Sequence, residues 1–298
     1  MMKLAKIANR GFTLPPGWGD VDIRGLTADS RAVEPGFLFA AIAGEANDGG
    51  RFIPEALARG AAALLAAPGV SIESTDLPIL RDQNVRRRLA LMAARFHPRQ
   101  PDTVVAVTGT NGKTSVVAFV RQIWELMGLR AASLGTVGLV APDIAEPVFH
   151  TTPDPVALHA VLAKLANGGV THLALEASSH GLKQCRMDGV RFAAGAFTNL
   201  SRDHLDYHAD IEDYFNAKAR LFTDLLLPGA AAVLNVDSAE GVRMAKLARR
   251  RDLVVLTVGA NGQTLKLVHR ERKGLAQQLV VRADKANHEI FLPLVGDF

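Results

Sequence analysis

The stretch that decides the fold is residues 104–115, which read Val-Val-Ala-Val-Thr-Gly-Thr-Asn-Gly-Lys-Thr-Ser. Its first half predicts a buried apolar strand, and its second half predicts a glycine-containing turn that opens into a helix. The backbone N–H groups of such a turn and the positive end of the helix dipole converge on phosphate oxygens. Lys113 can reach the terminal phosphates of a nucleotide, and the Thr114 hydroxyl can ligate Mg²⁺. The stretch therefore predicts a nucleotide-binding loop.

The general phosphate-loop pattern places another glycine five positions before Gly112, where this chain has Val107. The match is therefore to a shorter variant, Gly-Thr-Asn-Gly-Lys-Thr. A chance Gly-Lys-Thr in an ordinary strand-turn-helix is the alternative, and the correct flanks on both sides argue against it. The residues predicted to bind the nucleotide are Gly109, Thr110, Asn111, Gly112, Lys113, Thr114 and Ser115.

Outward from this loop, short apolar strands alternate with helices. Helices are predicted over 114–127, 155–166 and 211–222, and strands over 103–108, 171–175, 192–197, 231–234 and 253–258. Such alternation predicts an α/β fold with a mostly parallel, doubly wound sheet covered by helices on both faces. Three more strands with tight turns, over 264–269, 276–282 and 289–294, predict an antiparallel edge.

The first hundred residues predict a separate, small α/β unit. An apolar strand is predicted over 37–42, and a helix over 84–96 carries apolar side chains at spacings of three and four. The polar stretch 99–102, which contains a proline, is the predicted linker. We therefore expect two domains, residues 1–100 and residues 101–298.

Length and composition exclude several classes of protein. The 298 residues are 48% hydrophobic, which is enough for one or two buried cores. The formal net charge of +4 comes from scattered basic residues and does not favour nucleic acid. Cys185 is the only cysteine, so no intrachain disulfide forms and a reducing compartment fits best. With no signal-peptide pattern and no apolar run of about 20 residues, we expect a cytoplasmic protein that does not bind membranes.

Polar side chains also follow two of the other predicted strands. Glu176 comes directly after the strand 171–175, and His204 lies in the polar segment that follows the strand 192–197. Ligands of open parallel sheets gather at the carboxyl ends of strands, so these side chains could hold Mg²⁺ beside the phosphate loop. Histidine is an unusual ligand for this hard cation, and a capped helix start with solvent-facing histidines is the alternative.

Four segments together resemble the Mur ligase family, the ATP-dependent amide-forming synthetases of peptidoglycan precursors. They are residues 109–114, 151–154, 176–182 and 198–208. The phosphate loop alone does not separate this family from folylpolyglutamate synthetases. The other three segments together resemble the Mur ligases that add the third amino acid to UDP-N-acetylmuramoyl-L-alanyl-D-glutamate. The resemblance extends from about residue 29 to the last residue.

The resemblance implies a UDP-binding N-terminal domain and a central domain that uses ATP and Mg²⁺. Lys113, Lys218 and His204 are implied as catalytic residues, and Glu176, His204 and Lys218 join Thr114 around the metal. A lone helical lysine is normally a solvated charge, but the family carries the lysine matching Lys218 as a CO₂-derived carbamate, an anionic oxygen donor. The residues implied to contact the UDP substrate are Ser30, Glu45, Ala46, Asn47, Thr151, Thr152, Ser178, Gln184 and Arg186.

The implied reaction forms an acyl phosphate from ATP, which the amine of an amino acid then attacks. That amino acid is diaminopimelate or lysine, and both stay open because the residues that select it would lie in a further, C-terminal domain. Family members continue into this Rossmann-like domain beyond the place where this chain stops, at Phe298. We therefore expect a truncated, monomeric chain that binds the UDP substrate and ligates little or nothing.

Two other functions compete with this interpretation. A folylpolyglutamate synthetase-like ligase would share the phosphate loop, but the segment 151–154 and the N-terminal unit disfavour it. A non-catalytic nucleotide-sugar-binding module would explain the N-terminal unit. Retention of Lys113, Glu176, His204 and Lys218 together argues against such a module, because binding UDP requires none of them.

Overall fold

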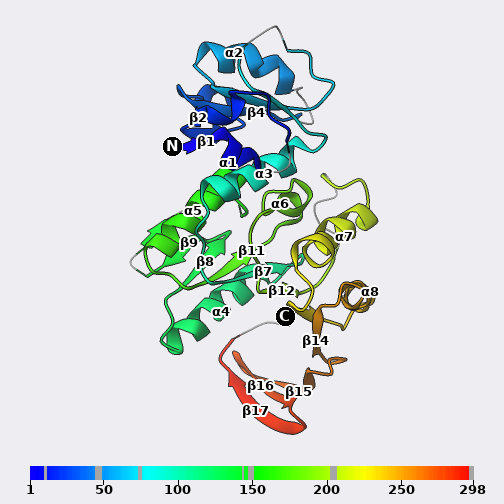
Figure 1. Cartoon of the computed structure of the whole chain (residues 1–298). Coiled ribbons are helices and arrows are strands. Elements are labelled where there is room, and N and C mark those ends of the chain that lie inside the picture. The colour runs from blue at the N-terminus through cyan, green and yellow to red at the C-terminus, as the bar shows by residue number, and fades with distance from the viewer. Residues whose placement is uncertain are drawn as a thin grey trace. The chain divides into compact units, whose positions relative to one another are not determined.

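The computed structural model describes residues 1–9, 12–43, 49–72, 76–142, 144–146, 151–201 and 207–294. The chain falls into two compact units, which Figure 1 shows in cartoon form. Unit 1 comprises residues 1–100 with 153–164 and 184–190, and unit 2 comprises residues 101–152, 165–183 and 191–298. The division into functional domains at residue 100 stays a prediction.

Unit 1 is built on a small parallel sheet. Its strands, in spatial order, are β3 (Gly25–Thr27), β4 (Phe37–Ala41), β5 (Ala63–Ala66) and β6 (Ile79–Arg81). A second, antiparallel pair joins β1 (Met2–Lys3) to β2 (Asp22–Ile23). The helical elements are α1 (Leu4–Ala8), η2 (Trp18–Asp20), η3 (Ser30–Ala32), η4 (Gly49–Phe52), α2 (Ile53–Ala58) and α3 (Val85–Phe96). Strand β5 is buried along its whole length, as expected for a parallel strand covered on both faces.

Helix α3 shows how the sequence pattern builds the core of unit 1. The side chain of Asn84 accepts a hydrogen bond from the backbone N–H of Arg87, which caps the start of the helix. One turn apart, Leu89 and Met92 are buried against the sheet, which confirms the predicted apolar stripe. Val156, from helix α5 (Pro155–Asn167), packs against the same core, so unit 1 takes part of its interior from a distant stretch of sequence.

Unit 2 is built on one sheet of eleven described strands. In spatial order they are β10 (Ile144–Glu146), β9 (Gly138–Ala141), β8 (Ala131–Gly135), β11 (His172–Glu176), β7 (Thr103–Thr108), β12 (Ala194–Phe197), β13 (Ala231–Asn235), β14 (Val254–Gly259), β15 (Leu265–Lys273), β16 (Ala276–Ala283) and β17 (Ala286–Leu292). The strands from β8 to β15 run parallel, and the pairs at both edges are antiparallel. This arrangement confirms the predicted mostly parallel sheet with an antiparallel edge.

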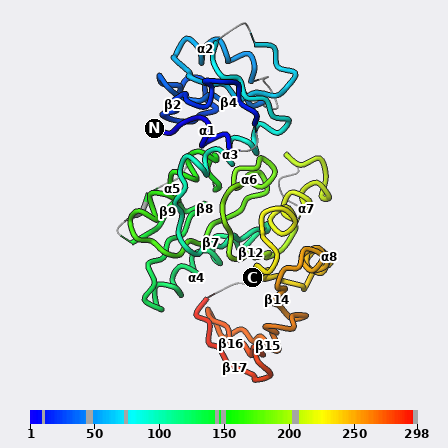
Figure 2. Tube along the Cα trace, viewed as in Figure 1, coloured from blue at the N-terminus to red at the C-terminus, as the bar shows by residue number. Residues whose placement is uncertain are grey.

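Helices cover the parallel part of this sheet. Helix α4 (Lys113–Leu126) packs against β8 and β11, and α8 (Ala239–Arg249) packs against β13 and β14. Helix α6 (Ser179–Lys183) contacts α7 (Ile211–Arg220), which continues into a π-helical turn, η5 (Leu221–Leu225). In Figure 2 the chain leaves α8 in orange, forms β14 and ends in the red hairpins of β15 to β17.

Two parts of unit 2 escaped sequence analysis. Strands β8, β9 and β10 are short and lack the uninterrupted apolar runs that revealed β7. Helix α8 buries mainly small residues such as Gly241, Ala245 and Ala248, so its apolar stripe is weak in sequence. Its start is conventional, because Ser238 caps the helix by accepting from the N–H of Gly241 at 3.1 Å.

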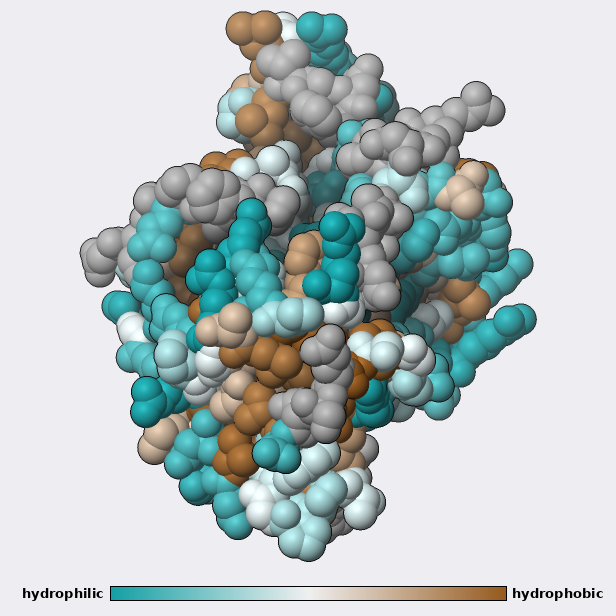
Figure 3. Space-filling model, turned by 90° about the horizontal axis from the view of Figure 1, so that it is seen from above, coloured by the Kyte–Doolittle hydropathy of each residue, from teal (hydrophilic) through white to brown (hydrophobic). Residues whose placement is uncertain are grey.

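One face of the molecule carries both polar and apolar residues. Figure 3 shows hydrophilic residues over much of one face, with hydrophobic residues gathered in smaller patches between them. The helices of the described chain include none with both the length and the apolarity needed to cross a membrane.

Candidate functional site

The phosphate loop links the end of β7 to the start of α4. Gly112 caps the helix with a positive φ of 84°, and Gly109 has a φ of 148°, conformations that residues with a Cβ rarely adopt. A Cβ at Gly109 would also lie 1.9 Å from Thr198 Oγ1. Both glycines are therefore required by the shape of the loop. Thr114 and Ser115 follow in the first turn of α4, where N–H groups have no partner within a helix.

The loop is held in place by the segment that follows β12. Strands β7 and β12 are neighbours in parallel register, so their carboxyl ends lie side by side. The backbone N–H of Thr110 donates to Asn199 O at 2.9 Å, and that of Asn111 donates to Asn199 Oδ1 at 3.0 Å. Thr198 Oγ1 donates to Asn111 O at 2.6 Å. Asn199 belongs to the segment 198–208 that resembles the Mur ligases, but no role was predicted for it individually.

Two lysines converge on the carbonyl of Gly109. Lys113 Nζ donates to Gly109 O at 3.0 Å and to Thr110 O at 2.8 Å. Lys218 Nζ, from helix α7, donates to Gly109 O at 2.7 Å. Lys218 is only 1% exposed, which differs from the solvated charge normal for a helical lysine. Its burial beside the phosphate loop makes it part of the site's geometry.

A buried carboxylate lies at the end of the neighbouring strand β11. Glu176 is 1% exposed, and its two oxygens accept from the backbone N–H and the hydroxyl of Thr136, at 2.8 and 3.2 Å. A Cβ at Gly135 would lie 2.1 Å from Glu176 Oε1, so the glycine makes room for this carboxylate. Thr136 was not among the predicted site residues, because strand β8, which precedes it, was not predicted.

The chemistry of Glu176 fits a cation. Within the described part of the chain Glu176 has no ion-pair partner, and a buried carboxylate without a positive charge is unfavourable. Oxygen donors of this kind suit Mg²⁺. The described residues nevertheless contain no group of three His, Cys, Asp or Glu side chains arranged to hold a metal ion. His204, the predicted histidine ligand, lies outside the described residues.

Three more hydroxyl groups lie close to Glu176 and Thr136. Thr151 Oγ1 lies 3.1 Å from Thr136 Oγ1, and Thr152 Oγ1 donates to the backbone carbonyl of Glu176 at 2.9 Å. The backbone N–H of Ser178 donates to Thr152 Oγ1 at 3.1 Å, and the Ser178 hydroxyl lies 3.0 Å from the same oxygen. The structure therefore brings together three predicted substrate residues, Thr151, Thr152 and Ser178, with the predicted metal ligand.

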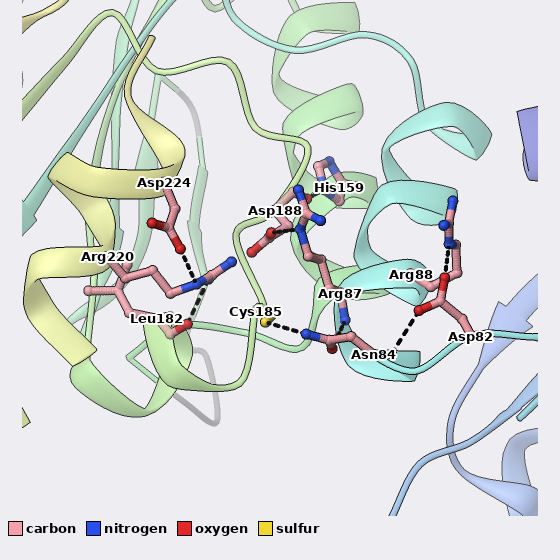
Figure 4. Close-up of polar contacts among 10 residues, drawn as sticks. All are labelled: Asp82, Asn84, Arg87, Arg88, His159, Leu182, Cys185, Asp188, Arg220 and Asp224. Carbon is pink, nitrogen blue, oxygen red and sulfur yellow. Dashed lines mark hydrogen bonds and ion pairs between the residues drawn. The ribbon is translucent and has the colours of Figure 1, made fainter. Parts of the chain in front are cut away.

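A charged network lies at the start of α7. Asp213 Oδ2 accepts from Lys183 Nζ at 2.7 Å and lies 2.9 Å from His208 Nδ1. The hydrogen bonds from Lys183 and then from His208 lower the pKa of Asp213 to about 2. Burial lowers the pKa of His208, whose side chain is fully enclosed. Two turns further along, Arg220 Nη1 donates to Leu182 O at 2.8 Å and joins α7 to α6 a second time; Figure 4 shows this contact.

The other predicted substrate residues belong to unit 1. Ser30 donates its hydroxyl to Glu55 Oε2 at 2.6 Å. Gln184 Oε1 accepts two hydrogen bonds from the Arg186 guanidinium, from Nε at 3.1 Å and from Nη2 at 2.8 Å, which orients the guanidinium plane. The remaining predicted residues of this set, Glu45, Ala46 and Asn47, lie outside the described residues.

The segment 184–190, which carries Gln184 and Arg186, is anchored by helices α3 and α5. Figure 4 shows Arg87 Nε of α3 paired with Asp188 Oδ1 at 3.0 Å. His159 Nε2 of α5 lies 3.0 Å from the carbonyl oxygen of Asp188. The Asp188 side chain is 3% exposed, so this ion pair is buried on one side. Sequence analysis missed both Arg87 and Asp188, because nothing in a local pattern joins residues about a hundred positions apart.

Comparisons with known protein families agree with this geometry. Residues 107–298 match the model described as "Mur ligase middle domain", and residues 22–97 match the model described as "Mur ligase family, catalytic domain". The first match includes the phosphate loop, the Glu176 cluster and helix α7, and the second lies within unit 1.

Named relatives are similar over nearly the whole chain. A protein of Brucella melitensis named UDP-N-acetylmuramoyl-L-alanyl-D-glutamate--2,6-diaminopimelate ligase is 49% identical over 300 residues, covering 100% of this chain and 61% of the relative. A protein of the same name from Mesorhizobium japonicum is 50% identical over 279 residues, covering 94% of this chain and 58% of the relative. The chain thus spans about three fifths of the length of these relatives.

Solved structures show the same fold. One with that ligase name in its title is 29% identical, with a TM-score of 0.86 over 99% of this chain and 60% of its own. A MurF ligase of Thermotoga maritima in complex with ADP is 19% identical, with a TM-score of 0.58 over 91% of this chain and 58% of its own. At that identity the second likeness concerns the fold alone.

Proposed function

The chain belongs to the Mur ligase family, and on that premise we propose that it is part of an ATP-dependent ligase that extends UDP-N-acetylmuramoyl-L-alanyl-D-glutamate by a third amino acid. The observation that carries the proposal is the convergence, at the carboxyl ends of β11, β7 and β12, of a phosphate loop, a buried carboxylate and a hydroxyl cluster. Phosphoryl transfer to a carboxylate substrate depends on positioning such groups side by side.

The names of the relatives favour diaminopimelate over lysine as the amino acid. Two relatives at 49% and 50% identity are named as 2,6-diaminopimelate ligases. We propose the same amino acid for this chain. The expectations of a monomer and of a cytoplasmic location stay predictions.

In the proposed reaction, an oxygen of the substrate carboxylate forms a bond to the γ-phosphorus of ATP, and ADP leaves. The amine of the amino acid then forms the amide bond at the acyl carbon and gives up one proton, and phosphate leaves with the electron pair of the broken C–O bond. Lys113 moves from the loop carbonyls to the phosphates of bound ATP, where its charge offsets the negative charge of the transferred group. Bound Mg²⁺ would supply further charge neutralisation, with Glu176 and Thr114 as oxygen donors.

The carbamate at Lys218 is a finer part of the proposal. Addition of CO₂ to Nζ would leave one N–H on that nitrogen, so the hydrogen bond to Gly109 O is compatible with the modification. The resulting anion would turn a buried cation into an oxygen donor for Mg²⁺. A carbamate resonance in the carbon NMR spectrum, seen with ¹³C-labelled bicarbonate and lost in Lys218→Ala, would support it. The same spectrum from wild type and variant would overturn it.

The function is tested by calorimetric titration of this chain with ATP in the presence of Mg²⁺, and with the UDP substrate. Lys113→Ala should weaken ATP binding about 10- to 100-fold, the range expected for a lost charge-assisted contact. Arg186→Ala should weaken binding of the UDP substrate by a similar factor. The matched controls are Lys246→Ala and Arg249→Ala, which remove exposed charges from α8.

Binding of dihydropteroate in place of the UDP substrate would favour a folylpolyglutamate synthetase-like function instead. Binding of the UDP substrate without any binding of ATP would favour a nucleotide-sugar-binding module. Either result would contradict the proposed ligase.

A further inference from the structure

Tyr214 is a large side chain buried beside the phosphate loop, and the reaction proposed above does not use it. It lies in the first half of α7 and is 0% exposed, so its hydroxyl is a polar group in the interior of unit 2. Buried hydroxyl groups are hydrogen-bonded in folded proteins. Tyr214 Oη lies 3.2 Å from Thr110 Oγ1, which is on the phosphate loop.

Thr110 is one of the loop residues that contact neighbouring segments. Its Oγ1 accepts from the backbone N–H of Ser201 at 3.0 Å and lies 3.4 Å from Ser201 O. A threonine hydroxyl has one proton and two lone pairs, so it can satisfy Ser201 and Tyr214 together. The hydrogen bond between the two hydroxyl groups therefore joins α7 directly to the phosphate loop.

The ring of Tyr214 also contacts Lys218, the side chain that binds Gly109, the loop residue before Thr110. Lys218 follows Tyr214 by four residues, so both lie on the same face of α7. Lys218 Nζ lies 4.3 Å from the centroid of the Tyr214 ring and donates to Gly109 O at 2.7 Å. The ring therefore packs against the side chain that holds the Gly109 carbonyl. Tyr214 therefore contacts Thr110 directly, and it contacts Lys218, the side chain that holds Gly109.

The ring is itself held from another direction by His208. The centroids of the two rings are 4.9 Å apart, and His208 Nδ1 lies 2.9 Å from Asp213 Oδ2. Asp213 is in turn fastened to Lys183 of α6. Packing of this kind restricts the side chain of Tyr214 to one orientation, with its hydroxyl toward the loop.

We infer that Tyr214 is a positioning residue that fixes the phosphate loop in the shape that binds the nucleotide. The inference rests on the proposed function, in which this loop binds ATP. A loop already held in its binding shape loses less conformational freedom when the nucleotide arrives, so loss of the Tyr214 hydroxyl lowers nucleotide affinity. Tyr214 does not need to touch the nucleotide to have this effect.

The test is Tyr214→Phe, which removes the hydroxyl and keeps the ring against Lys218 and His208. In calorimetric titration of the full chain with ATP and Mg²⁺, well below the melting temperature, the affinity should fall about 3- to 10-fold, the range of one neutral hydrogen bond. Tyr207→Phe is the matched control, because it removes a hydroxyl from the tyrosine that stacks on His180, at 3.7 Å between centroids. Its affinity for ATP should stay within about twofold of wild type.

A double-mutant cycle separates positioning from general destabilisation. Thr110→Val removes the same hydrogen bond from the loop side and should weaken ATP binding by itself. In that background Tyr214→Phe should have no further effect, because the two hydroxyl groups act through one contact. If Tyr214→Phe does not fold, Thr110→Val still decides the question, since unchanged affinity in that variant would overturn the inference.

The possible outcomes distinguish failure of the inference from failure of the proposed function. Wild-type chain that fails to bind ATP overturns the proposed function together with the inference. Wild-type binding with equal affinity in Tyr214→Phe overturns the inference alone, and so do fully additive effects in the cycle. Weaker binding in Tyr214→Phe but not in Tyr207→Phe, with the cycle non-additive, supports it.

Discussion

The phosphate loop of unit 2 and the segment 184–190 of unit 1 both carry predicted ligand-binding residues, but they are held in different ways. The phosphate loop owes its shape to its own glycines, with Gly109 and Gly112 in conformations that only glycine adopts readily. The segment 184–190 owes its position to Arg87 and His159, which come from helices elsewhere in the sequence. A loop of the first kind leaves a local pattern in the sequence, and one of the second kind leaves none.

The two regions also differ in what stabilises them. Backbone hydrogen bonds from Thr110 and Asn111 to Asn199 fasten the phosphate loop. The segment 184–190 depends on an ion pair in which the Arg87 side chain is 58% exposed and the Asp188 side chain is 3% exposed. Removing the arginine leaves a buried carboxylate behind, and this lowers the free energy of unfolding more than loss of an exposed contact does. We therefore expect the phosphate loop to be sensitive to side chains at its glycines, and the segment 184–190 to be sensitive to loss of its ion pair.

The largest effect is expected for Gly109→Ala. The new Cβ would lie 1.9 Å from Thr198 Oγ1 and would strain a backbone with a φ of 148°. We expect ATP binding to be lost and the free energy of unfolding to fall by about 1–3 kcal/mol. Gly128→Ala is the control, because that glycine has a φ of 79° but no atom within 4 Å of the new Cβ.

Titration calorimetry and urea denaturation of both variants measure these effects. Gly128→Ala should be destabilised while keeping its affinity for ATP. If Gly109→Ala binds ATP with wild-type affinity, the phosphate loop tolerates a side chain at Gly109. Its shape would then not depend on this glycine, contrary to the comparison with the segment 184–190.

A smaller effect is expected for Arg87→Gln. Leaving Asp188 buried without its arginine should lower the free energy of unfolding by about 1–3 kcal/mol, weaken binding of the UDP substrate and leave ATP binding unchanged. Arg31→Gln is the matched control, because its pair with Asp29 is on the surface, with 80% of the Arg31 side chain exposed. Its free energy of unfolding should stay close to that of wild type, because an exposed ion pair contributes little to stability.

The variant Asp188→Asn sharpens this test. The double variant Arg87→Gln/Asp188→Asn should lose less free energy of unfolding than the sum of the losses in the two single variants, because each substitution removes the same ion pair. Urea denaturation of the four proteins measures the cycle. Additive losses in the free energy of unfolding would show that the ion pair between Arg87 and Asp188 does not anchor the segment 184–190.

The smallest effect is expected for the charged network at the start of α7, and it depends on pH. The pKa of Asp213 is lowered from 3.8 to about 2, so the folded state favours the charged carboxylate. The resulting stabilisation is present above pH 3.8 and is lost as the pH falls through about 2. The difference in melting temperature between wild type and Asp213→Asn should therefore be constant from pH 7 to pH 5 and shrink between about pH 4 and pH 2. A difference independent of pH would mean that the charge on Asp213 is not what stabilises the fold.

Much of unit 2 was predictable because its signals are local. Strand β7 has the bounds predicted for it, Thr103–Thr108, and helices α4, α5 and α7 start within a residue of their predicted positions. Each is marked by an apolar run, or by a helix start such as Gly112 or Asp210. Strands β8 to β10 were missed, and with them Thr136, because short strands at a sheet edge are specified by pairing rather than by their own composition.

By itself the sequence determined the phosphate loop, the parallel sheet around it and the family to which the chain belongs. These depend on residues close together in the chain, where a glycine or an apolar run acts on its own backbone. Only the tertiary structure decided that Lys218 is buried against Gly109, that Tyr214 faces Thr110 and that Arg87 holds Asp188. Such contacts join residues about a hundred positions apart, and they form only when packing of the whole unit brings their helices and loops together.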